Sequence, residues 1–531
     1  MRGRASAAEP WLVILTLIAG ICLLTVGGAT STSTSAPASL SGDTTVGTDT
    51  SGDATSAPAA TGPAGPAPAS AAAAPSSTSV GTAGLPAVPN GPTTAGTAPA
   101  PTSGGISALP SGAPHPSSAA GTIACPKGGA EIGVPYQADL AAGQALVGHP
   151  DNPYGSLSSD QIEAQDNKVF AAFNKMGGLG GCPIKPVYFQ WYISRSDGHT
   201  QSQQECATFS QDHHVAVALV MTFENFTASE CLAQAHVPVV WGSLEVPLVN
   251  NAILNRHPGL MYTIGISADR MRPFIDQLAS AKYFDPGTKL GVIIRDDGDG
   301  VGPALWNNEW KPELAALHIN VVKTYTISYD TSGSTASVLA SASSQMQAAV
   351  VNFKVAGVDH VLFAPGSGSF TFTPAAQAQN YYPRYAMTSA DQPVTNESFN
   401  SNDGLKDSVV VGWNPVEDGV PATQWTKNAT TALCGQIGKE AGSTPGASDP
   451  VAPLCENLTF LRAAYQNATS LSWTALKAGV ARLQHSWPTS VGLGPTFFTD
   501  GRYDGLAATR IAMFDDAAKT YRYTGPIQPL P

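Results

Sequence analysis

The sequence predicts an α/β fold with two consecutive doubly wound lobes, each built on a parallel sheet. Short apolar runs alternate with longer segments of helical spacing, which is typical of β-α-β units and a buried parallel sheet. The pattern restarts at residues 290–294. Because crossovers in such sheets are right-handed, loops of similar role follow the carboxyl ends of the strands in both lobes, and ligands bind at such edges.

The elements follow one another in a regular order. In the first half we expect strands at 131–136, 184–191, 215–220, 237–241 and 261–264, and helices at 160–176, 202–211, 228–235 and 268–281. In the second half we expect strands at 290–294, 319–325, 361–364, 385–387 and 409–411, and helices at 304–317, 336–356, 374–380, 422–440 and 461–483. Each lobe then has about 150 to 200 residues, enough for its own core.

The N-terminal quarter has a different character. Arg2 and Arg4 precede an uncharged apolar run at 11–26, so residues 1–29 are expected to be an export signal, cleaved after Ala29 or retained as a membrane anchor. Residues 30–121 are dominated by Ala, Pro, Ser, Thr and Gly and contain no aromatic residue, Lys or Arg, which predicts a disordered linker. A long spacer favours the anchored form, at the cell surface or elsewhere outside the cytoplasm.

Six cysteines fall in the folded part, and an even number in an exported protein indicates disulfides. Fifteen connectivities are possible, and we favour the sequential one. No Cys-x-x-Cys occurs and no cysteine has a histidine at ligand spacing, so a metal site is not expected. The favoured pairs are Cys125 with Cys182, Cys206 with Cys231, and Cys434 with Cys455.

The net charge is −12 with only 27 Lys and Arg residues, and no basic run occurs outside the N-terminal segment. Such a chain would be repelled by nucleic acids and other polyanions. Nucleic-acid binding is therefore excluded from the candidate functions.

One glycine-rich run carries a resemblance to a known family. The helix expected at 160–176 ends in Asn174-Lys-Met-Gly-Gly-Leu-Gly-Gly directly before a strand, where glycines with positive φ let the chain reverse tightly. This run resembles the branched-chain amino-acid-binding (Leu/Ile/Val-binding) family of type I periplasmic solute-binding proteins, whose first helix ends in Asn-x-x-Gly-Gly-Ile-x-Gly. Later segments that fall in the family's order are 261–269, 289–297, 356–363 and 494–505.

The resemblance implies a two-lobed domain at 122–531 with crossing hinge strands. Lobe 1 would take about 122–266 plus a return segment, lobe 2 about 285–410, and 411–531 would be shared. It also implies reversible capture of a small solute, often for an ABC importer. The chain departs from the family at Pro135–Asp139 and at Thr222–Thr227, where Glu224 would repel a ligand carboxylate. An amide, or a neutral, cationic or aromatic compound, is therefore as good a candidate as an amino acid.

Candidate ligand-binding residues lie in the loops that follow the strands, because loops on rigid scaffolds carry binding groups. Several of them could instead be ordinary caps of turns and helices. Trp241 and Trp413 end strands near the expected cleft and could form aromatic walls or fill the core. The candidates are Tyr136, Gln137, Thr222, Glu224, Asn225, Gly242, Ser243, Asp297, Ser367 and Asp391.

The leading hypothesis is an exported solute-binding protein, monomeric, without cofactor or metal, that serves ABC transporter membrane subunits. The first alternative is a membrane-tethered ligand sensor or protein-interaction module with the same fold. The second is a cell-envelope hydrolase, although the sequence has no Gly-x-Ser-x-Gly, His-Glu-x-x-His or Walker motif. We therefore expect a receptor and not an enzyme.

Overall fold

The computed structural model describes residues 123, 125–139, 157–193, 198–220, 226–242, 248–257, 259–329, 335–400, 402–443, 451–494 and 496–531. All of them belong to one unit, residues 109–531. The expected export signal and linker lie outside the described residues, as do Thr222, Glu224, Asn225 and Ser243. Within the described ranges, no helix is both long and apolar enough to span a membrane.

The first lobe is built on a five-stranded sheet in the order β2-β1-β3-β4-β5, in which every pair is parallel. Almost all residues of β1, β3, β4 and β5 are buried, as expected for a sheet covered by helices on both faces. The strands are β1 (Ala130–Gln137), β2 (Ile184–Trp191), β3 (Val217–Val220), β4 (Val239–Trp241) and β5 (Leu260–Tyr262). The helices between them are α3 (Ser159–Lys175), α4 (Gly198–Ala207), η2 (Thr208–Asp212), α5 (Phe226–Gln234) and α6 (Asn251–Arg256).

The glycine run that carries the resemblance ends α3 as predicted. Gly177 and Gly178 have φ of 94° and 64°, and a Cβ on Gly178 would lie 1.8 Å from the carbonyl oxygen of Cys182. Asn174 then fixes the following strand, because its Nδ2 donates to the Ile184 carbonyl and its Oδ1 accepts from the Ile184 amide. Only glycine allows this close reversal between helix and strand.

The second lobe is built on an eight-stranded sheet, with the order β12-β11-β10-β9-β8-β6-β7 and with β13 paired to β11. The pairs from β7 to β10 are parallel, whereas β11, β12 and β13 are antiparallel additions. The strands are β6 (Lys289–Asp296), β7 (Asn320–Ser328), β8 (His360–Phe363), β9 (Arg384–Thr388), β10 (Val409–Gly412), β11 (Ala508–Asp515), β12 (Thr520–Tyr523) and β13 (Gln528–Pro529). The helices are η3 (Ala268–Arg270), α7 (Pro273–Ser280), α8 (Val301–Ala304), η4 (Leu305–Trp310), α9 (Lys311–Ala316), α10 (Thr335–Val355), α11 (Ser369–Ala378), η5 (Ser389–Asp391), α12 (Pro393–Phe399) and α13 (Asn402–Leu405).

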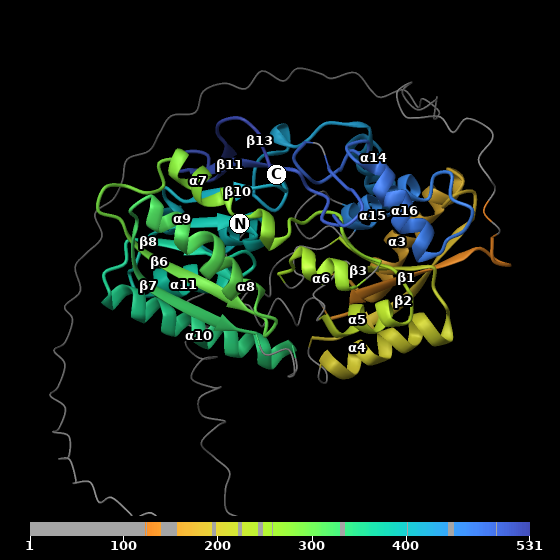
Figure 1. Cartoon of the computed structure of the whole chain (residues 1–531), viewed down its shortest axis with the longest axis horizontal. Helices are drawn as coiled ribbons and strands as arrows, with labels where there is room; N and C mark the ends of the chain where they lie inside the picture. Colours follow the sequence, from red (N-terminus) through yellow and green to blue (C-terminus); the bar gives the residue numbers. More distant parts are fainter. Residues whose placement is uncertain are drawn as a thin grey trace, which may run out of the picture. The chain divides into compact units, whose positions relative to one another are not determined.

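Three later helices return to the first lobe. α14 (Ala429–Ala441) and α15 (Val451–Ala464) pack against α3, and α16 (Trp473–Leu483) packs against α15, as Figure 1 shows with the blue helices beside the orange α3. The single helix expected at 461–483 is therefore wrong. Asn467 adopts a φ of 65°, which interrupts the helix, and Ser472 caps a new one through the Ala475 amide.

The chain consequently passes between the lobes three times. We call residues 263–272 the first crossing, 413–428 the second and 484–507 the third; the short 3-10 turn η6 (Ala422–Gln424) lies in the second. The third crossing pairs with the end of β5, because the Tyr262 amide donates to the Tyr503 carbonyl and the Gly505 amide to the Tyr262 carbonyl. It also pairs with the second, through the Leu493 amide and the Trp413 carbonyl.

Two apolar clusters form the core. One runs through the first lobe and one face of the second sheet, and the other covers the opposite face, where α10 and α11 pack. Trp241 and Trp413 both lie in the first cluster with 1% of their surface exposed. Of the two interpretations of these tryptophans, the structure supports core packing, which removes large apolar areas from water.

The three disulfides pair the six cysteines sequentially, as favoured from the sequence. Cys125–Cys182 ties the segment before β1 to the turn before β2, Cys206–Cys231 joins α4 to α5, and Cys434–Cys455 joins α14 to α15. Their sequence separations are 57, 25 and 21 residues. Loops of this size correspond to about 3 to 4 kcal/mol each in the chain-entropy account of cross-links.

Candidate functional site

The carboxyl edge of the second sheet carries a buried ion pair that the sequence analysis missed. Arg295, in β6, places Nε 2.7 Å from Asp297 Oδ2 and 2.9 Å from Oδ1. Its Nη1 donates to the Gly366 carbonyl at 2.7 Å, and its guanidinium lies 5.0 Å from the centre of the Tyr329 ring. The predicted site residue Asp297 is therefore neutralised by its neighbour, in the geometry of a charge-assisted pair.

Asp297 also reaches the first lobe. Its Oδ2 accepts from the amide of Leu248 at 3.4 Å, and Leu248 lies between β4 and α6 of the first lobe. This contact joins the loop after β6 to the segment that follows the loop after β4. The carboxyl edges of the two sheets are thus linked at one of the positions predicted from the sequence.

Asp391 and Ser367 lie together at the same edge, after β9 and β8. Asp391 Oδ2 accepts from the amide and the hydroxyl of Thr388, both at 2.9 Å, and Oδ1 accepts from the Ser367 amide at 3.3 Å. Burial raises the pKa of Asp391 to about 7 in spite of these donors. The Ser367 hydroxyl is buried and has no hydrogen-bond partner among the described residues. Asp391 thus holds the loop after β8 through the Ser367 amide, and the Ser367 hydroxyl is left for a ligand.

Tyr136 and Gln137 end β1, where successive side chains point to opposite faces of the sheet. Tyr136 points towards α3, because its hydroxyl donates to Glu163 Oε1 at 2.6 Å and accepts from Gln190 Nε2 at 2.8 Å. Burial raises the pKa of Tyr136 to about 12. The Gln137 side chain makes no hydrogen bond with any described residue. Of the two, Gln137 is the better placed to meet a ligand.

Gly242, directly after β4, packs against a polar side chain from α15. A Cβ on Gly242 would lie 2.2 Å from Nδ2 of Asn457, which is fully buried. Asn457 Oδ1 accepts from the Thr263 hydroxyl at 2.9 Å, and its Nδ2 has no hydrogen-bond partner in the part of the chain that the structure describes. Asn457 was not predicted, although the adjacent polar residues Glu456 and Asn457 in a largely apolar helix were a signal for it.

The first and third crossings are tied by a second buried charge cluster. Asp504, fully buried, accepts from the Ser267 amide at 2.9 Å and from Arg270 Nη1 at 2.6 Å. Arg502 lies near the same carboxylate, with Nε 3.8 Å from Oδ1. This arrangement fixes the first and third crossings to each other.

The remaining predicted residues, Thr222, Glu224, Asn225 and Ser243, lie outside the described residues, in the loops after β3 and β4. Their roles stay predictions. In the part of the chain that the structure describes, no group of three or more His, Cys, Asp or Glu side chains could hold a metal ion.

The fold is shared with solved structures. No family model matches the sequence, and no match was found among curated proteins. Among solved structures, a substrate-binding periplasmic protein from Ralstonia solanacearum aligns with a TM-score of 0.53 and 14% identity, covering 74% of this chain and all of the other. An extracellular ligand-binding receptor from Verminephrobacter eiseniae aligns with a TM-score of 0.52 and 13% identity, over 74% of this chain and 100% of that one.

A leucine-binding protein from Thermotoga maritima aligns with a TM-score of 0.51 and 9% identity, covering 75% of this chain and 99% of the other. At identities this low, a structural match is evidence for the fold and not for the function. The chain therefore has the two-lobed fold of the type I periplasmic binding proteins.

Proposed function

We propose that the protein is an exported solute-binding protein that captures a small molecule between its two lobes, as a receptor and not as an enzyme. The observation that carries the proposal is the two-lobed fold with three crossings, since solved proteins of this fold are named as substrate-binding and leucine-binding. Loops at the carboxyl edges of doubly wound sheets are where such folds place their ligands. Delivery to an ABC importer and anchoring through residues 1–29 belong to the same proposal.

The described part of the site favours a ligand that is uncharged where it meets the second lobe. Arg295 is paired with Asp297, so the two side chains together present no net charge to a ligand. Among the described residues, the groups at the two edges without a hydrogen-bond partner include the Ser367 hydroxyl, the Gln137 amide and Asn457 Nδ2. We therefore favour an amino acid, an amide or a related compound that contacts these residues through an uncharged part. Buried polar groups gain most from a complementary hydrogen-bond partner.

Native mass spectrometry on the full-length protein from its own host tests the proposal. A retained mass identifies the ligand class, and thermal-shift titrations with amino acids, amides, peptides and small aromatics then rank the candidates. We expect Gln137→Ala and Ser367→Ala to weaken the thermal shift, whereas Gln347→Ala, on the exposed face of α10, leaves it unchanged.

The outcome against the proposal is equally definite. If no mass is retained and no compound in these four classes shifts the melting temperature, capture of a small solute loses its support. A protein partner purified with the ligand-free chain would then favour the tethered interaction module.

A further inference from the structure

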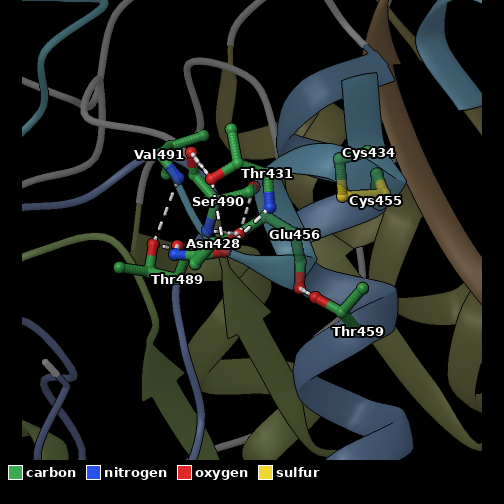
Figure 2. Close-up of a disulfide and its surroundings, with 9 residues drawn as sticks. All are labelled: Asn428, Thr431, Cys434, Cys455, Glu456, Thr459, Thr489, Ser490 and Val491. Atoms are coloured by element: carbon green, nitrogen blue, oxygen red, sulfur yellow. Dashed lines mark hydrogen bonds between the residues drawn. A yellow bond between two sulfur atoms is a disulfide. The ribbon is translucent and has the colours of Figure 1, made fainter. Parts of the chain in front are cut away.

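A buried carboxyl group on α15 accepts several hydrogen bonds from the third crossing. Glu456 is fully buried, and its Oε2 accepts from the amide of Ser490 at 2.6 Å and from the Ser490 hydroxyl. Its Oε1 accepts from the hydroxyl of Thr489 (Figure 2). The Thr489 hydroxyl in turn accepts from the amides of Val491 and Gly492 at 3.2 and 2.9 Å. One side chain therefore organises four consecutive residues of the crossing.

The same two residues are held from the end of the second crossing. Asn428 Nδ2 donates to the Thr489 carbonyl at 2.7 Å, while its Oδ1 accepts from the Thr431 amide at 2.9 Å and so caps α14. The Thr431 hydroxyl lies 3.5 Å from the Ser490 carbonyl. Thr489 and Ser490 thus lie between two helices that both contact them (Figure 2).

The Cys434–Cys455 disulfide joins these two helices next to the contacts. Cys455 immediately precedes Glu456, and Cys434 follows Thr431 by three residues, which places it one turn along α14. Both cysteines are buried, so the cross-link lies inside the packed helix pair. It fixes how far Glu456 and Asn428 can move apart.

A similar arrangement holds the other end of the second crossing on the second lobe. Asp418, fully buried, accepts from the Ser389 hydroxyl at 2.6 Å and from the Tyr523 hydroxyl at 2.5 Å. Ser389 Oγ itself accepts from the amides of Trp413 at 2.7 Å and Asn414 at 3.1 Å. The start of the second crossing is therefore attached to η5, which directly follows β9, and to β12.

We propose that Glu456, Asn428 and the Cys434–Cys455 disulfide form a hinge lock, which fixes Thr489 and Ser490 to the first lobe and confines bending to the stretch between this lock and Asp418. Within that stretch Thr426 contacts Gly492 of the third crossing, and just before it Trp413 accepts a hydrogen bond from the Leu493 amide. The inference rests on the proposed function, because a hinge matters only where the lobes move during capture.

The physical reason for a lock is the cost of leaving buried groups unpaired. No ion pair neutralises Glu456 among the described residues, so the hydroxyl and amide donors of Thr489 and Ser490 provide its stabilisation. Moving the crossing away would leave the buried carboxyl group of Glu456 without its donors. The lobes can therefore bend on either side of these residues more easily than through them.

The test uses the ligand-free full-length protein with Glu456→Gln, and with Glu440→Gln on the exposed face of α14 as the matched control. Gln keeps the size of the side chain but presents an amide donor where Glu456 only accepts. We expect amide exchange in residues 489–493 to become about tenfold faster in Glu456→Gln, while β6 and β8 stay unchanged. The control should match the parent protein.

A second measurement separates a hinge lock from a purely local contact. Spin labels carried by non-canonical amino acids at the exposed positions 167 in α3 and 347 in α10 report the distance between the lobes. The distance distribution should broaden in Glu456→Gln and not in Glu440→Gln; an unchanged distribution would overturn the lock. Neither readout needs a ligand, so failure of the proposed function would show in mass spectrometry and the thermal-shift titrations and not in these two measurements.

A milder variant covers the case in which Glu456→Gln does not fold. Ser490→Ala removes one hydroxyl donor and keeps the amide, so its effect on exchange in 489–493 should be smaller and in the same direction. Exchange equal to that of the parent protein in this variant would also contradict the lock.

Discussion

Arg295 and Asp297 form an ion pair in which both side chains are less than one-tenth exposed, with Nε 2.7 Å from Oδ2. Two charges removed from water in this way stabilise the fold little as a pair, but the loss of one partner leaves the other buried and uncompensated. The pair therefore sets both the neutrality of the second lobe's edge and the contact of Asp297 with Leu248.

We expect Asp297→Ala to lower the free energy of unfolding by about 3 to 5 kcal/mol, because it leaves the buried Arg295 guanidinium without its carboxylate. The matched control is Arg272→Ala, which breaks the pair with Glu313 where Arg272 is 64% exposed, and which should cost less than about 1 kcal/mol. Urea denaturation of the full-length protein measures both. Equal costs for the two variants would show that the Arg295 pair is as solvated as a surface pair.

Stability should fall as the pH rises from about 5 to above 7. Burial raises the pKa of Asp391, Glu397, Asp418 and Glu456 to about 7 each. A carboxyl group whose pKa is raised by folding stabilises the fold fully below its unfolded pKa, and this stabilisation is lost as the pH passes the folded pKa.

For Glu456 the shift from 4.5 to about 7 corresponds to a pH-dependent change of about 3 kcal/mol. In Glu456→Gln this part of the loss of stability with rising pH should disappear, whatever the absolute stability of the variant. Melting temperatures of both proteins between pH 4.5 and 8 measure the two slopes. Parallel curves would mean that Glu456 has an ordinary pKa in the folded state.

The strands of the parallel sheets could be predicted because fully buried strands read as short apolar runs, and the glycine reversal after α3 leaves an unmistakable sequence. The antiparallel strands β11 and β12 were missed. β11 includes Arg510 and Asp515 and β12 includes Arg522, so neither reads as a continuous apolar run. A strand with one exposed face needs an alternation signal that short segments carry weakly.

The site was predictable as a set of loops but not as a set of contacts. The edge positions of Asp297, Ser367 and Asp391 follow from the topology, whereas the neutralisation of Asp297 by Arg295 depends on which way one side chain turns. Glu456 lies on α15, which follows another helix and no strand of either sheet, so it is brought to the hinge by tertiary packing alone.

Gly242→Ala should destabilise the protein by about 1 to 3 kcal/mol, because the added Cβ would lie 2.2 Å from Asn457 Nδ2 in a fully packed region. Gly435→Ala is the control, since Gly435 lies in α14 with open space at its Cβ position; alanine there should stabilise the helix by about 0.5 to 1 kcal/mol. If the steric account is right, Asn457→Ala combined with Gly242→Ala should cost less than the sum of the single changes. Additive costs in denaturant unfolding would contradict it.

Tyr136→Phe and Gln137→Ala should separate folding from binding at two adjacent positions. Tyr136→Phe removes a hydroxyl that joins Glu163 to Gln190, so it should cost about 1 kcal/mol of stability and leave the ligand-induced thermal shift unchanged. Gln137→Ala removes no hydrogen bond to a described residue, so it should keep the stability and reduce the thermal shift. Thermal unfolding with and without the compound found by mass spectrometry gives both quantities. The reverse result, with binding lost in Tyr136→Phe and kept in Gln137→Ala, would place the ligand on the α3 face of β1 and would move the site away from the edge that the two lobes share.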